Sequence, residues 1–397
     1  MGVAEVMGTV AAVSSTAWIA LVAVAVWLGL LFGRGGFWRA DQKLESAGIT
    51  HTEADPVIAV IPARDEVYTI GRAVKSLLRQ DYPGPLTVVV VDDNSGDGTA
   101  EAARAVAERP DEKACLHVIQ GKALPPGWSG KMWAVHQGLK HARAVAPDAR
   151  YVLLTDAEIE HNPGNLSRLM ARAVRETRVL VSLMVRLRCV SAWEKILIPA
   201  FVFFFQKLYP FPRVNDPSSP VAGAAGGCML VRLDALDAAG GIEAIRSELI
   251  DDCALARKIK KQGSIWLGLA TRTRSLRRYE DQGEIWRIVT RTAFTQLGYS
   301  AVYLMLMILF MILAYLWPPV AVVWGVLAGD WLAAGFGLVG WLMMAVAYWP
   351  TLKVYHMPMW RSLTLPLAAL LYGGMTLDSA RRHWMGHGRV WKGRTYQ

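Results

Sequence analysis

Long apolar runs near both ends of the chain predict helices that cross a membrane. Residues 10–32 carry no charged side chain and are followed by Arg34, Arg39 and Lys43. About 20 apolar residues are enough to span a bilayer as a helix, and cations beside a span favour its cytoplasmic end. We therefore expect residues 1–34 to form an uncleaved N-terminal anchor with Arg34 inside. A signal peptide is the alternative, but no basic residue precedes the apolar run.

A second apolar region lies in the last quarter of the chain. Residues 299–349 are almost free of charge and are interrupted at Pro318-Pro319 and at Gly329-Asp330. Interruptions of this kind are typical of helix ends. The pattern therefore predicts at least two spans, over residues 299–317 and 331–349.

A shorter apolar stretch, residues 363–377, precedes a basic C-terminal segment, residues 381–397. If the stretch crossed the bilayer, the basic segment would lie outside, against the positive-inside tendency. We therefore expect a re-entrant or interfacial segment here, with membrane helices over residues 299–380 and a basic cytoplasmic tail over 381–397. Residues 195–212, rich in Phe and Tyr, are either another interfacial segment or a buried core helix.

Between the apolar ends, residues 55–298 alternate strand and helix patterns. The predicted strands are residues 57–61, 86–92, 116–119 and 151–155, and the predicted helices are 67–80, 99–107 and 131–144. Fully apolar strands alternating with helices predict an α/β domain with a Rossmann-like, mostly parallel sheet covered on both faces. Ligands of such sheets bind at the carboxyl ends of the strands.

Composition narrows the class of partner. The hydrophobic content is 53%, and the formal net charge is +10. Arg and Lys beside apolar segments indicate an anionic membrane surface, and no nucleic-acid-binding signature accompanies the charge, so we expect no nucleic acid. The cysteines form no CxxC pair, which argues against a disulfide framework and a thiolate zinc site and fits a reducing cytoplasm.

Two acidic clusters directly follow apolar strands. Asp92 and Asp93 end one strand, and Asp156 and Glu158 follow another. Carboxylates at the carboxyl ends of strands suit a divalent cation, Mg²⁺ or Mn²⁺, that holds a diphosphate. Alternate residues of an extended segment point the same way, so Asp156 and Glu158 are expected to share the cation. An Asx-rich turn explains the residues after Asp93 but not the two adjacent acids Asp92 and Asp93.

Two further motifs have both a structural and a functional interpretation. The loop Pro62-Ala63-Arg64-Asp65-Glu66 leaves the first strand where a nucleotide could lie, or it is only a polar helix start. Asp251 and Asp252 begin a predicted helix, where the helix dipole alone favours acids. A carboxylate is also the group that takes a proton from an attacking hydroxyl.

In this order the four motifs resemble family-two glycosyltransferases with the GT-A fold. The resemblance implies a nucleotide-sugar donor, with UDP as the expected nucleotide, a divalent cation and inversion at the sugar carbon. It assigns the donor to residues around the first two strands, the metal to the second acidic cluster and the general base to Asp252, with Asp251 as the competing acid. The implied donor residues are Pro62, Ala63, Arg64, Glu66, Asp92, Asp93, Lys131 and Asp156, and the implied metal ligands are Asp156 and Glu158.

Two positions depart from that family. Its metal motif usually ends in Asp, whereas Glu158 stands here and lengthens the arm of the ligand. The QxxRW signature of processive synthases is degraded to Ile288-Val289-Thr290-Arg291-Thr292, which keeps only the Arg. Arg291 is still expected to face the diphosphate as a third catalytic residue, but an aromatic platform for a growing chain is in doubt.

The whole layout, including the stretch from Gly127 to Trp133, is similar to the hopene-associated glycosyltransferases of bacterial hopanoid gene clusters. We therefore expect a multi-pass enzyme of a bacterial-type inner membrane, with its catalytic domain in the cytoplasm. It would transfer one sugar to a lipid hydroxyl, such as that of a hopanoid. The alternatives are a processive polysaccharide synthase and a non-catalytic nucleotide-binding membrane scaffold.

Overall fold

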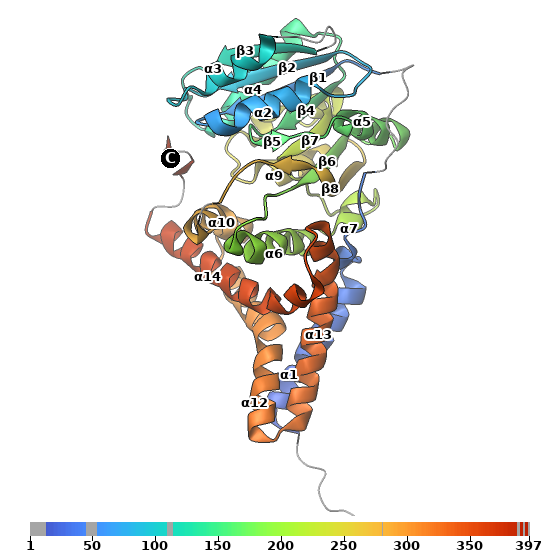
Figure 1. The fold of residues 1–397 in the computed structure, drawn as a ribbon, viewed down its shortest axis with the longest axis vertical. Helices are drawn as coiled ribbons and strands as arrows, with labels where there is room; N and C mark the ends of the chain where they lie inside the picture. Colours follow the sequence, from blue (N-terminus) through green and yellow to red (C-terminus); the bar gives the residue numbers. More distant parts are fainter. Residues whose placement is uncertain are drawn as a thin grey trace, which may run out of the picture.

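The computed structural model describes residues 13–44, 54–108, 114–279 and 281–386, and the pairs 390–391 and 394–395. It is elongated and has three levels along its long axis (Figure 1). A sheet with its covering helices lies at one end, three helices of a middle level lie below it, and a bundle of long apolar helices lies at the other end. The first twelve residues of the expected anchor and, in the expected basic tail, residues 387–389, 392–393 and 396–397 lie outside the described residues.

The sheet has eight strands in the order β3-β2-β1-β4-β7-β6-β8-β5. The strands are β1 (Val57–Ala63), β2 (Leu86–Asp92), β3 (Ala114–Gln120), β4 (Tyr151–Thr155), β5 (Ile159–Glu160), β6 (Leu180–Arg186), β7 (Cys228–Arg232) and β8 (Ile265–Ser275). The first four strands form a parallel unit, but β7 is antiparallel to both β4 and β6, and β5 is antiparallel to β8. The prediction of a mostly parallel sheet is therefore corrected to a mixed one. An apolar strand buried on both faces looks the same in either direction, which is why the pattern of β7 could not show this.

Helices cover both faces of the sheet. They are α2 (Val67–Leu78), α3 (Thr99–Arg104), α4 (Gly130–Val145), α5 (Asn165–Arg175), α7 (Phe211–Asn215), α8 (Leu233–Ala238) and α9 (Asp251–Ile259). Successive residues of β2 pack into two different hydrophobic clusters, Val89 and Val91 into one and Val88 and Val90 into the other. Because side chains alternate along a strand, both faces are buried, as the continuous apolar runs predict.

The strand order creates a crevice. From β1 the chain proceeds outward through β2 and β3 and then returns to the other side of β1 with β4. Connections therefore leave the carboxyl ends of β1 and β4 in opposite directions. In open α/β sheets this switch point is where ligands bind. The acidic motifs that come after β2 and β4 lie at this same edge of the sheet.

Among the described residues, three helices are long and apolar enough to cross a membrane: Ser15–Gly33, Ala301–Ala328 and Trp331–Val354. The first contains α1 (Ser15–Leu28), the second contains α11 (Ala301–Met311) and α12 (Trp317–Ala328), and the third is α13 (Trp331–Val354). Together they form the narrow end of the molecule (Figure 1).

The predicted helix end at Pro318-Pro319 is wrong. A π-helical turn, Ile312–Leu316, joins α11 to α12, and the prolines lie in the first turn of α12. Proline is tolerated in a first turn because its missing N–H would have no partner there. The helix ends instead at Gly329, which has a left-handed φ of 70°, and Asp330 caps α13 by accepting from the Ala333 amide.

The middle level consists of α6 (Ala192–Leu208), α10 (Gln282–Gln296) and α14 (Leu365–Trp384). Leu197 and Phe203 of α6 are fully buried among the helices of the middle and narrow levels, so most of the segment 195–212 is a core helix. A turn with positive φ at Gly298 and Tyr299 separates α10 from α11.

The expected boundary between membrane helices and tail at residue 380 falls inside α14. Arg381 and Arg382 belong to its last turn and form ion pairs with Asp378 at 2.7 and 2.9 Å. Cations are favoured at a helix C-terminus and one turn after an acid. The stretch 363–377 is the first part of this longer helix, which is not among the three candidate spans.

Candidate active site

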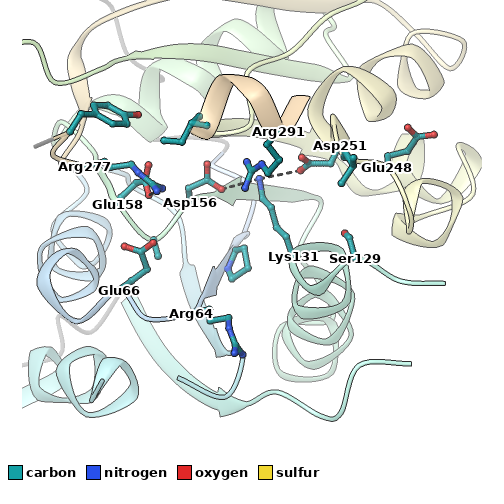
Figure 2. Close-up of a pocket in the computed structure, with 15 residues that line it drawn as sticks. Arg64, Glu66, Ser129, Lys131, Asp156, Glu158, Glu248, Asp251, Arg277 and Arg291 are labelled. Carbon is teal, nitrogen blue, oxygen red and sulfur yellow. Dashed lines mark hydrogen bonds and ion pairs between the residues drawn. The ribbon is translucent and has the colours of Figure 1, made fainter. Parts of the chain in front are cut away.

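A cavity of about 270 Å³ opens at the carboxyl ends of β1 and β4. Figure 2 shows its charged side chains converging from β1, α4, the turn after β4, α9 and α10. Its lining consists of Pro62, Arg64, Glu66, Ser129, Lys131, Asp156, Ala157, Glu158, Glu248, Leu249, Asp251, Arg277, Tyr279, Ile288 and Arg291.

The ends of β1 and β2 form one wall. The Asp93 amide donates to the Ala63 carbonyl at 2.8 Å, and Arg64 donates to the Asp93 carbonyl at 2.5 Å. Asp92 and Asp93 are almost completely buried and do not line the cavity. The structure therefore places Arg64 at the surface of this wall and the two acids in the layer that supports it.

The predicted donor residues thus fall into two groups. Pro62, Arg64 and Glu66 line the cavity, whereas Ala63 is buried beneath it with Asp92 and Asp93. The loop is held by its neighbour, since the Glu66 amide donates to the Thr99 hydroxyl at 2.8 Å. These bonds keep the wall in place before a ligand arrives.

The second acidic cluster lies on a turn. The Ile159 amide donates to the Asp156 carbonyl, so residues 156–159 bend rather than continue β4 as the extended segment that we expected. Both Asp156 and Glu158 nevertheless line the cavity. Asp156 lies 3.0 Å from the ammonium of Lys131, and Glu158 lies 3.3 Å from the guanidinium of Arg277.

These two carboxylates fit a divalent cation. Among the described residues no group of three or more His, Cys, Asp or Glu could hold a metal by itself. Mg²⁺ and Mn²⁺ commonly use one or two carboxylates together with substrate phosphates. Asp156 and Glu158 would then supply the protein ligands, and the donor diphosphate would supply the rest.

Lys131 connects Asp156 of the second acidic cluster to α9. Its ammonium lies between Asp156 and Asp251, at 3.0 and 3.1 Å. Burial alone would lower the pKa of Lys131, but the carboxylates of Asp156, Asp251 and Asp252 outweigh it and raise the pKa. The lysine is therefore a permanent cation in the site. Ser129 caps α4 by accepting from the Met132 amide, which fixes the turn that carries Lys131.

The two acids that begin α9 have different surroundings. Asp251 lines the cavity and pairs with Lys131. Asp252 does not line it; its carboxylate accepts from the amides of Gly226 and Cys253 at 2.9 and 2.7 Å. Burial and the neighbouring Asp251 raise the pKa of Asp252 to about 6, against the opposing effects of Lys131 and the two amides.

Several cavity residues were not identified from the sequence. Arg277 follows β8 and faces Glu158, and Tyr279 and Glu248 also line the cavity. Burial opposes the charge of Arg277, but the carboxylate of Glu158 more than compensates, so its pKa is raised. The only sequence signal was the basic pair Arg277-Arg278 after an apolar strand, which resembles any solvated strand end. Arg291, by contrast, was expected here, and it reaches the cavity from α10 (Figure 2).

His161 follows the second acidic cluster in sequence, but its role is to hold neighbouring side chains in place. Its ring is buried and bonds to the Thr155 hydroxyl and to the Asn165 amide. Burial lowers the pKa of His161 to about 4, so the ring stays neutral.

Comparison with known proteins supports a glycosyltransferase. Residues 58–240, somewhat less than half of the chain, match the sequence model of glycosyl transferase family 2. The match includes β1 to β7, and so Lys131, Asp156 and Glu158, but ends before α9 and α10. The pair Asp251-Asp252 and Arg291 therefore lie outside it.

Two curated relatives are similar over part of their length. A 4,4'-diaponeurosporenoate glycosyltransferase of Staphylococcus aureus is 30% identical over 144 residues, which are 35% of this chain and 34% of that protein. An uncharacterized protein of Methanocaldococcus jannaschii is 27% identical over 129 residues, 32% of this chain and 46% of that protein. The chain thus spans less than half the length of these relatives.

One solved structure shares the fold over most of both chains. It is a mannosyltransferase of Pyrobaculum calidifontis, solved in complex with GDP-Man and Mn²⁺. The likeness covers 89% of this chain and 98% of that one, with a TM-score of 0.50 and 20% sequence identity. The fold is accordingly GT-A-like, as the resemblance of the motifs implied.

Proposed function

We propose that this chain is a membrane-bound, inverting glycosyltransferase that moves one sugar from a nucleotide-sugar donor to the hydroxyl of a lipid. The observation that carries the proposal is the convergence of Asp156, Glu158, Lys131 and Asp251 in one cavity at the switch point of the sheet. The family match of residues 58–240 supports the same reaction class.

The donor would lie along the wall formed by β1 and β2. Arg64 and Glu66 would face its nucleoside, which we propose to be uridine, and Asp92 and Asp93 would hold that wall from beneath. Arg277 and Arg291 would face the diphosphate from the opposite side. A Mg²⁺ or Mn²⁺ ion on Asp156 and Glu158 would neutralise the charge of the departing nucleoside diphosphate. The solved mannosyltransferase with Mn²⁺ supports this assignment.

Transfer needs a base at the far side of the sugar. We propose that Asp252 takes the proton of the acceptor hydroxyl as its oxygen attacks the anomeric carbon and the bond to the diphosphate breaks. The raised pKa of Asp252 suits this role because the carboxylate then binds a proton nearer to neutral pH. Asp251 would hold Lys131, although it is the acid that lines the cavity, so the two must be compared directly.

The place where the cavity opens supports a lipid acceptor. Ile288 and Arg291 belong to α10, which lies in the level between the sheet and the apolar bundle (Figure 1). A hydroxyl presented at the cytoplasmic surface of an inner membrane could reach this side. We propose a hopanoid or a similar membrane lipid as the acceptor. The relative named as a diaponeurosporenoate glycosyltransferase supports an apolar acceptor.

A donor screen tests the function. Membranes that contain the protein are incubated with labelled nucleotide sugars and Mg²⁺ or Mn²⁺, and the label in extracted lipid is measured. We expect transfer from at least one donor, its loss in Asp156→Asn or with excess chelator, and partial activity in Glu158→Asp, which keeps a shorter carboxylate. Glu101→Gln, in an exposed ion pair of α3 that does not line the cavity, is the control and should stay active. Full activity of Asp156→Asn would contradict the metal assignment.

A further inference from the structure

One side of α10 lines the cavity, and another side contacts α14. Ile288 and Arg291, three residues apart, line the cavity, whereas Trp286 and Phe294 contact α14. At about 100° per residue, Trp286, Thr290 and Phe294 centre on one side of α10, and Ile288 and Arg291 centre on another. Arg291 and Phe294, three residues apart, lie at the adjoining edges of these two sides. The turn of α10 that carries Arg291 therefore packs against α14 on a side other than the one that lines the cavity.

Ser379 of α14 forms hydrogen bonds with the backbone of that turn. Its hydroxyl accepts from the Phe294 amide at 3.1 Å and donates to the Thr290 carbonyl. An α-helix ordinarily joins these two groups, which are four residues apart, directly. Ser379, Thr290 and Phe294 are each less than 7% exposed, so water does not compete for these bonds. A side chain inserted into a helix ladder bends the helix at that point and fixes its local direction.

Asp378 makes a second connection one residue earlier. Its carboxylate accepts from the indole N–H of Trp286 at 2.9 Å and is held by Arg381 and Arg382. The indole bond, with the two arginines, lowers the pKa of Asp378 to about 2, so the carboxylate stays charged. Gly374 completes the contact, since a Cβ there would lie 3.3 Å from the Trp286 ring. Together these residues set the distance between the two helices.

A neighbouring side of α14 is apolar and exposed. Leu367, Leu370, Leu377 and Trp384 are 46 to 62% exposed and recur at intervals of three and seven residues. The helix α14 itself lies in the middle level, next to the apolar bundle (Figure 1). A helix with one apolar face and arginines at its end suits the surface of an anionic bilayer.

We propose that Ser379 and Asp378 are positioning residues for Arg291, so that the helix whose free face meets the lipid also holds the cationic wall of the active site. This proposal rests on the proposed function. The two polar contacts act on Arg291 through the backbone and Trp286 of α10, and neither residue touches the donor.

Substitution of Ser379 tests the connection. Ser379→Ala removes both bonds to α10, and we expect kcat/KM for transfer to fall, by up to about 10²-fold if Arg291 moves by about 1 Å. Thr376→Ala is the matched control, because the Thr376 hydroxyl bonds only to the Tyr372 carbonyl of its own helix. It should change kcat/KM less than about twofold. Asp378→Asn should resemble Ser379→Ala in direction.

A double-mutant cycle separates positioning from general support of the fold. If Ser379 acts through Arg291, Ser379→Ala should cost little in an Arg291→Ala background, because interacting sites are not additive. An equal cost in both backgrounds would overturn the proposal.

A second readout does not depend on catalysis. Modification of Arg291 by phenylglyoxal, followed by mass spectrometry, should change in rate in Ser379→Ala and not in Thr376→Ala. An unchanged rate would overturn the proposal even if no donor were found. A changed rate in a protein that transfers no sugar would leave the positioning intact and refute the proposed function instead.

Discussion

At the scale of single residues, the chemistry depends on which acid at the start of α9 accepts the proton. Asp252→Asn should lower transfer by roughly 10²–10⁴-fold, the typical loss when a positioned base is removed. Nucleoside diphosphate affinity should survive, because the proposed role of Asp252 is toward the acceptor, and Lys131 keeps its ion pairs with Asp156 and Asp251. Asp251→Asn should be milder, since Lys131 keeps Asp156 as a partner. Initial rates and titration of the nucleotide decide between them. If Asp251→Asn is the more damaging, the base is Asp251.

The same pair predicts a pH dependence. Transfer needs the ionised base, so kcat/KM should fall as the pH drops through the pKa of Asp252, about 6. Lys131 lowers that pKa, so Lys131→Met should move the acid limb of the profile to higher pH. The position of the limb is measured over pH 5–8, apart from any loss in absolute rate. A limb that moved to lower pH would refute the coupling.

At the scale of elements, the approach of α4 to the sheet depends on a glycine. A Cβ on Gly138 would lie 2.6 Å from Val60 and 2.8 Å from Val91, both within the core. Gly138→Ala should therefore destabilise the fold by about 1–3 kcal/mol, the usual cost of overpacking. In α2, Gly71 meets only ordinary contacts at 3.6 Å and beyond, so Gly71→Ala is the control and should be neutral or stabilising. The thermal unfolding midpoints of Gly138→Ala and Gly71→Ala are measured in detergent and compared. Equal midpoints would show that α4 can move away from the sheet.

The elements also show what the sequence could predict. β1 to β4 and the helices between them lie within three residues of their predicted ends, because their apolar patterns are periodic and their turns are polar. The strands β5 to β8 were not predicted, and the continuity through Pro318-Pro319 was missed. The pairing of those strands depends on remote partners, and the continuity depends on a π turn. The same holds in the site. Asp156 and Lys131 stand in motifs, whereas Arg277 enters the cavity only because β8 ends beside Glu158.

At the scale of the whole molecule, the three candidate spans lie at one end and the sheet domain at the other (Figure 1). In the topology that we propose, Arg34 after the first span lies on the cytoplasmic side, and the α12–α13 turn lies at the far end of the bundle. The Ser14 hydroxyl bonds to Asp330 in that turn, which places the start of α1 on the same side as the turn.

Labelling of cysteines from outside intact cells tests this topology. Ala328→Cys, in the exposed turn before α13, should react with a membrane-impermeant maleimide, because it lies on the outer side. Met385→Cys, 57% exposed at the end of α14, should react only after the membrane is permeabilised. The native Cys115 is exposed in the sheet domain and is a built-in control that should stay protected in intact cells. Efficient labelling of Met385→Cys from outside would mean that α14 crosses the bilayer, and the interfacial position of that helix would then be wrong.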